Sequence, residues 1–141
     1  MFFQNLYEEI SVPKGVLEEL DAGIKSGEEA PDIKKYLWIK VERIRNSDFI
    51  KMIPDLGRGE AEVITLGCES EGSLLVMDDF LGRAIAKLQG LTFTGTAGIL
   101  LRAKEEKIIP EVGPILQRLK ALGFYLNDSL INTIMTLADE K

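Results

Sequence analysis

The sequence contains no histidine and only one cysteine, Cys68. Without histidine, the chain cannot build a Ser-His-Asp triad, a Cys-His nucleophilic pair or a zinc site that uses imidazole. A lone cysteine excludes an internal disulfide framework, and its apolar neighbours favour a small buried side chain. Carboxylates are therefore the side chains left to carry chemistry.

Long apolar runs are also missing. Runs such as residues 74–77 are short, and none approaches the roughly 18 residues that a membrane span requires. The first five residues lack the basic start and the apolar stretch of a secretory signal. We therefore expect a soluble, cytoplasmic protein with no membrane partner. The 141 residues, 45% of them hydrophobic, suit a single domain over 1–141.

Positive charge is scarce, because 17 basic residues stand against 23 acidic ones and the net charge is −6. Such a chain does not bind nucleic acid by bulk attraction, although a local basic strip is compatible with it. The densest basic stretch consists of Lys34, Lys35, Lys40, Arg43 and Arg45. This stretch forms either a solvated face, which we favour, or a binding surface for RNA.

The first half of the chain alternates between strand and helix patterns. Apolar residues at helical spacing predict a helix over residues 13–25 with Ser11 near its N-cap. A polar segment with glycine and proline predicts a loop over 26–32, and alternation predicts a half-buried strand over 38–44 near a sheet edge.

The middle of the chain continues the alternation. A helix is predicted over residues 57–72, entered tightly at Gly57 and Gly59. The apolar run 74–77 predicts a strand covered on both faces, residues 81–88 predict a helix, and 91–94 predict another strand. This order is typical of an α/β fold with a mainly parallel sheet, whose strand order the pattern leaves open.

The last third of the chain is predicted to be helical. Apolar residues recur there every three or four positions from residue 97 onward. Pro110 and Gly123 interrupt this pattern and separate three helices.

Three carboxylates suggest a metal site. Asp78 and Asp79 follow the strand 74–77 at its carboxyl end, where open α/β sheets place their ligands. Glu60 lies in the first turn of the preceding helix. Together these oxygens would suit Mg²⁺ or Mn²⁺. Each acid also has a plain structural interpretation. An aspartate can cap the next helix, and a glutamate in the first turn is stabilised by the helix dipole whatever its function.

Two other acid-based sites fit less well. Phosphatase folds use an Asp-x-Asp loop, and Asp78-Asp79-Phe80 lacks that spacing. Receiver domains place paired acids after the first strand and a phosphoacceptor aspartate after a later one, but here the following strand ends in Thr94-Gly95-Thr96.

Three sequence blocks stand out: L-G-R-G-E-A-E (56–62), L-V-M-D-D (75–79) with R-A (83–84), and T-G-T-A-G-I-L-L-R-A-K (94–104). They resemble the corresponding blocks of short PIN-domain proteins related to toxin-type endoribonucleases. Val12-Pro13 with the following E-E-L (18–20) and Gly123-Phe124 match as well, so the resemblance covers nearly the whole chain.

The resemblance implies a doubly wound, mainly parallel sheet with flanking helices, and acids that bind Mg²⁺ or Mn²⁺. It assigns the metal to Glu19, Glu60, Asp78 and Asp79, with Glu60 and Asp79 as the catalytic pair. Metal-bound water would attack a phosphodiester of single-stranded RNA. A cognate antitoxin is the partner that such relatives imply.

One departure concerns the start. The family begins with an apolar strand that ends in an aspartate and is followed by a helix, and here Met1 falls inside what should be that helix of the family. Either the start has been assigned too late, or the protein is a shortened, degenerate member. We therefore expect an incomplete metal site with weak or no activity, and self-association into a homo-oligomer through exposed sheet edges. The alternative is a non-catalytic interaction protein that uses this fold and its C-terminal helices for assembly.

Overall fold

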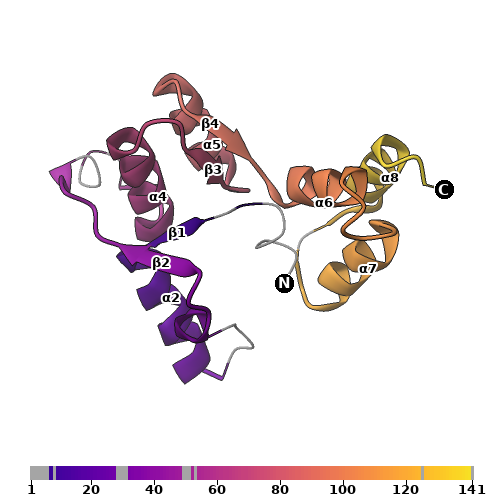
Figure 1. Ribbon diagram of the computed structural model, residues 1–141, viewed down its shortest axis with the longest axis horizontal. Coiled ribbons are helices and arrows are strands. Elements are labelled where there is room, and N and C mark those ends of the chain that lie inside the picture. The colour runs from indigo at the N-terminus through magenta and orange to yellow at the C-terminus, as the bar shows by residue number, and fades with distance from the viewer. Residues whose placement is uncertain are drawn as a thin grey trace. The chain divides into compact units, whose positions relative to one another are not determined.

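The structure is a computed structural model that describes residues 7, 9–27, 32–48, 52, 54–124 and 126–140. The chain forms two compact units, an N-terminal unit over Tyr7–Thr94 and a C-terminal unit that contains the chain from Gly95 onward. The N-terminal unit is α/β and the C-terminal unit is helical, as the sequence pattern predicts (Figure 1). The single domain expected from the length stays a prediction.

The N-terminal unit begins with strand β1 (Ile10–Pro13), which leads directly into helix α2 (Lys14–Lys25). A 3-10 turn, η1 (Ile33–Lys35), precedes strand β2 (Ile39–Glu42), and β1 pairs with β2 in parallel, with Ile10 opposite Ile39. Ser11, predicted to lie near the N-cap of α2, is two residues before the N-cap residue. Ser11 lies inside β1, and Pro13, whose φ of −62° suits a helix entrance, is the N-cap residue.

Helix α4 (Arg58–Glu69), strand β3 (Leu74–Val76), helix α5 (Phe80–Leu88) and strand β4 (Thr92–Thr94) follow. Strands β3 and β4 pair in parallel, as expected for strands joined by a helix. Among the described residues the strands form two separate parallel pairs rather than one continuous sheet. Helix α4 contacts α2 and β1 on one side and β3 and α5 on the other, so it links the two pairs (Figure 1).

Two expectations about burial are wrong. Strand β3 is covered on one face only, since Leu75 is buried whereas Leu74 and Val76 are 38% and 46% exposed. Leu75 packs with Ile64 of α4, and successive strand residues point to opposite faces. Cys68 is exposed rather than a buried filler, because the buried side of α4 at that turn is occupied by its neighbour Gly67.

The C-terminal unit contains the three expected helices, α6 (Thr96–Glu105), α7 (Gly113–Ala121) and α8 (Asp128–Leu137). Their core gathers seven buried side chains, Leu100, Val112, Leu116, Leu126, Ile131, Ile134 and Ala138. Gly123 follows α7 with φ of +96°, a conformation that favours glycine and ends the helix. Among the described residues, no helix is long and apolar enough to span a membrane.

Candidate functional site

The helices α2 and α4 cap each other's N-termini. The backbone N–H of Gly15, in the first turn of α2, donates to Glu62 Oε1 of α4 at 3.0 Å. The backbone N–H of Gly59, in the first turn of α4, donates to Glu19 Oε1 of α2 at 2.9 Å. Neither helix has a side-chain cap at its own N-cap residue. Each glutamate therefore accepts a hydrogen bond that a local Ser, Thr, Asp or Asn would otherwise accept.

Glycine allows the observed approach of the carboxylate at both capped positions. A Cβ atom added to Gly59 would lie 2.6 Å from Glu19 Oε2, and one added to Gly15 would overlap Glu62 Oε2. Any larger residue would push the incoming carboxylate away from the backbone N–H. The two glycines thus allow the close approach on which the reciprocal caps depend.

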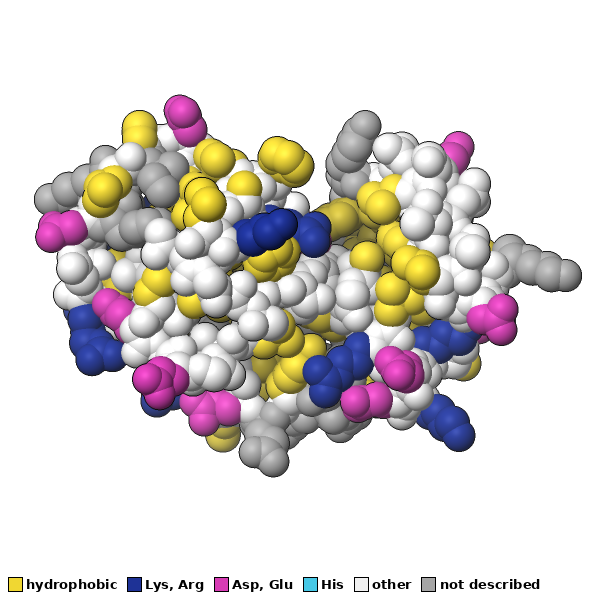
Figure 2. Space-filling view, turned by 90° about the horizontal axis from the view of Figure 1, so that it is seen from above, with side chains coloured by type: hydrophobic (Ala, Val, Ile, Leu, Met, Phe, Trp, Pro, Cys, Tyr) yellow, Lys and Arg dark blue, Asp and Glu magenta, His cyan; other side chains and the backbone are white. Residues whose placement is uncertain are grey.

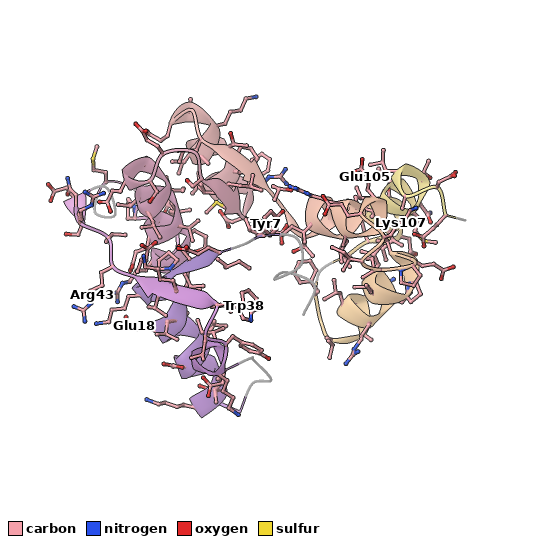
Figure 3. All side chains as sticks on the ribbon, in the orientation of Figure 1. Tyr7, Glu18, Trp38, Arg43, Glu105 and Lys107 are labelled. Carbon is pink, nitrogen blue, oxygen red and sulfur yellow. The ribbon has the colours of Figure 1, made fainter. Side chains whose placement is uncertain are left out.

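Arg58 completes this contact. Its Nε donates to Glu62 Oε2 at 2.9 Å, and its Nη1 lies 3.0 Å from Glu18 Oε2. The Glu62 residue is only 3% exposed, so its carboxylate is buried with hydrogen bonds to both oxygens. Such charge-assisted bonds offset the cost of burying the charge. Glu18 is more exposed and projects from α2 in Figure 3, which labels it.

Two of the predicted metal ligands meet at the N-terminus of α4. Glu19 is held on the N–H of Gly59, the residue next to Glu60. The half-buried Glu60 carboxylate folds over Gly57, where an added Cβ atom would overlap its Oε2. Glu60 forms no hydrogen bond or ion pair with any residue that the structure describes. Its carboxylate is therefore not committed to a cap.

The other two predicted ligands lie at the start of α5. Asp79 Oδ2 accepts a hydrogen bond from the N–H of Gly82 at 2.7 Å, so Asp79 is the N-cap of α5. Asp78 and Asp79 are both exposed. Between the cap and ligand interpretations that the sequence left open, the observed contact of Asp79 is the cap.

The four predicted ligands lie at the starts of two different helices, α4 and α5. Within the described ranges, no three acidic or cysteine side chains come close enough together to hold one ion. Glu19 and Asp79 each use a carboxylate oxygen to cap a helix, which leaves Glu60 as the least constrained of the four. The assignment of Glu19, Glu60, Asp78 and Asp79 to a metal stays a prediction.

The sequence interpretation missed Glu62 and Arg58, although a signal was present. Helices α2 and α4 both begin with a basic residue followed by glycine, and neither start offers a capping side chain. A helix N-terminus with a bare first turn needs an acceptor from elsewhere. The C-terminal unit contains a similar cap from a distant glutamate. Glu140 accepts hydrogen bonds from the backbone N–H groups of Val112 and Gly113, at the start of α7, at 2.8 and 3.0 Å.

Two side chains of the basic stretch near β2 pair with acids. Lys40 lies 3.3 Å from Glu42, and Arg45 Nε lies 3.9 Å from Glu69 Oε1. Arg43 projects away from the strand (Figure 3). The Lys34 side chain lies outside the described residues. These contacts favour the solvated face over an RNA track.

A family model described as a PIN domain matches residues 1–140 of the chain. The match spans both compact units and includes α2, α4 and α5 with their four predicted ligands. No curated protein and no solved structure matches the chain closely enough to count as a relative.

Proposed function

Because this chain belongs to the PIN-domain family, we propose that it is a metal-dependent nuclease scaffold that cleaves single-stranded RNA weakly or not at all. Mg²⁺ or Mn²⁺ is the proposed cofactor. The toxin-type role, with a cognate antitoxin as partner and a cytoplasmic location, belongs to the same proposal and rests on the family resemblance.

One observation supports the weak activity. Of the four carboxylates that the resemblance assigns to the metal, Glu19 and Asp79 each accept a backbone hydrogen bond that caps a helix. A carboxylate in this role is held in place by its N–H donor, and moving it would leave that donor without a partner. Glu60 is the acid with most freedom to serve a reaction, so it is the residue to test.

The test is cleavage of a single-stranded RNA labelled at one end, with Mn²⁺, with Mg²⁺ and with a chelator. Glu60→Gln keeps the size of the side chain and removes its charge. Glu71→Gln is the matched control, because Glu71 is an exposed acid of the same unit with no assigned role. We expect slow, metal-dependent cleavage that is lost in Glu60→Gln and retained in Glu71→Gln.

Cleavage that survives Glu60→Gln, or that proceeds in the chelator, would contradict the proposed chemistry. A complete lack of cleavage with either metal would remove the catalytic part and leave a second candidate function, non-catalytic assembly. Apolar exposure in the C-terminal unit favours that candidate, since Leu122, Leu130 and Leu137 are 64%, 43% and 70% exposed. Hydrophobic side chains also reach the surface among scattered charges in Figure 2.

A further inference from the structure

The outward face of α5 combines an aromatic ring with two cations. Phe80, Arg83 and Lys87 are spaced by three and four residues, so they lie along one side of the helix. All three are exposed, and Phe80 is 89% exposed in the first turn. The opposite side of α5 is buried through Gly82, Ile85 and Ala86. Phe80 therefore lies on the side of the helix away from these buried residues.

Among the described residues, the two cations have no acidic partner. Neither Arg83 nor Lys87 forms an ion pair with any residue described in the structure, whereas Arg58 and Lys104 both bind glutamates. The Arg83 guanidinium instead lies 5.2 Å from the centre of the Phe93 ring of β4. Like charges four residues apart on a helix repel each other weakly. An anion bound on this face would remove that repulsion.

Single-stranded nucleic acid has the chemistry that this face can accommodate. Its bases stack on exposed aromatic rings and on guanidinium planes, and its phosphates bind cations. Leu81 and Leu88 of α5 are also exposed, at 38% and 84%, so the helix offers apolar surface as well. The two cations, which lack an ion pair among the described residues, favour an anionic ligand. Asp78 and Asp79 immediately precede Phe80, so a strand held here would pass beside the acids of the proposed site.

We infer that Phe80, Arg83 and Lys87 form the surface of this protein that positions single-stranded RNA, with a base stacked on Phe80 and phosphates on Arg83 and Lys87. This role rests on the proposed function, because it names how that function holds its substrate. Phe80 and Lys87 contact the RNA away from the reacting bond. They are therefore positioning residues, whose loss changes binding in the absence of any cleavage.

The experiment measures binding of a short fluorescein-labelled oligouridylate to the full chain by fluorescence anisotropy, with a chelator present to prevent cleavage. Phe80→Leu removes the ring and keeps an apolar side chain, and it should weaken binding roughly 5- to 150-fold, the range for loss of one stacked base. Phe80→Trp should restore it. Leu37→Ala is the control, because Leu37 is 98% exposed in the same unit.

The phosphate contacts are tested through salt. Lys87→Gln should reduce the slope of log affinity against log salt by about 0.7, as expected for one phosphate contact on a single strand. Lys25→Gln removes an exposed cation from the end of α2 and should leave the slope unchanged. Circular dichroism is the folding control. A variant that weakens binding because it misfolds would change the spectrum, whereas substitutions at these exposed positions should leave the spectrum unchanged.

Several outcomes would overturn the inference. One is a wild-type chain that does not bind the oligonucleotide, and another is equal binding by Phe80→Leu and wild type. A third is a Phe80→Leu variant in which only the sedimentation of the protein changes, because that result would show that Phe80 contacts a second copy of the chain. Cleavage that is unaffected by Phe80→Leu would leave the proposed function standing without this inference. RNA binding that needs the ring, without cleavage, would support the inference and remove the catalytic role.

Discussion

The buried glutamate between α2 and α4 provides the sharpest test of the fold. Glu62→Ala removes the acceptor for the backbone N–H of Gly15 and the partner of Arg58 Nε. The Gly15 N–H is buried and has no capping side chain within its own helix. The variant therefore leaves a buried donor without its partner at the start of α2, and the two helices lose one of their two reciprocal contacts.

The size of the effect follows from burial. An unsatisfied buried donor costs about 1–3 kcal/mol. The Arg58 side chain is 61% exposed, so loss of its ion pair adds at most about 1 kcal/mol. We expect Glu62→Ala to lower the free energy of unfolding by roughly 1–4 kcal/mol, a large share of the about 5–15 kcal/mol typical of a folded protein. This corresponds to a fall in Tm of roughly 3–14 °C for a chain of this length.

Thermal and urea unfolding, followed by circular dichroism, measure this change. Glu18→Ala is the matched control, because Glu18 also contacts Arg58 but its side chain is 44% exposed. It should cost less than about 1 kcal/mol. A Glu62→Ala variant within about 0.5 kcal/mol of the Glu18→Ala control would refute the buried cap.

A double-mutant cycle tests the same contact from the other side. Gly15→Ala introduces a Cβ atom that would overlap Glu62 Oε2, so the carboxylate has to leave the Gly15 N–H. Gly15→Ala and Glu62→Ala therefore remove the same interaction. The double variant should be more stable than the sum of the single changes predicts, by about 1 kcal/mol or more, whereas independent sites would add.

Three further predictions concern other parts of the chain. Asp79→Asn should change Tm little, because asparagine also caps helices, while Asp79→Ala should cost about 1 kcal/mol; equal Tm shifts of wild type and Asp79→Asn on adding Mn²⁺ would reject Asp79 as a metal ligand. Backbone N–H groups, first that of Val112, and the Lys104 ammonium hold the pKa of Glu140 below its ordinary value. The folded state therefore favours the carboxylate, so Glu140 stabilises the protein above about pH 4.3, and this contribution is lost as the pH falls through the lower pKa of the folded state. When urea unfolding is measured at a series of pH values, Glu140→Gln should flatten this dependence of stability on pH. Sedimentation should show self-association at micromolar concentration that Val76→Lys reduces, since Val76 lies on the uncovered face of β3; a wild-type monomer would contradict this prediction.

The candidate site shows how far sequence reasoning extends. The sequence placed Asp79 after a strand and at a helix start, and both follow from local spacing. It also located Glu60 in the first turn of α4. It could not choose between cap and ligand for Asp79, because both roles use the same carboxylate and differ only in what lies within reach. The 2.7 Å contact with the Gly82 N–H shows the cap, and the ligand role of Asp79 stays a prediction.

Regular spacing in the sequence determined most of the secondary structure. Helices α2 and α4 to α8, and strands β2 to β4, lie where apolar periodicity predicts them, because a helical or extended backbone repeats over neighbouring residues. Strand β1 was missed, since four residues ending in proline carry too little pattern and are stabilised by pairing with β2, whose partner residues lie further along the chain.

Only the tertiary structure decided which side chains are covered and which acids serve as caps. Leu74 and Val76 belong to an apolar run that looks buried on both faces, yet exposure depends on what packs against each face. Glu62 and Glu19 reach glycines that are 47 and 40 residues away. A helix start without its own cap shows in the sequence that an acceptor is needed, but the identity of the acceptor depends on which helix packs beside it.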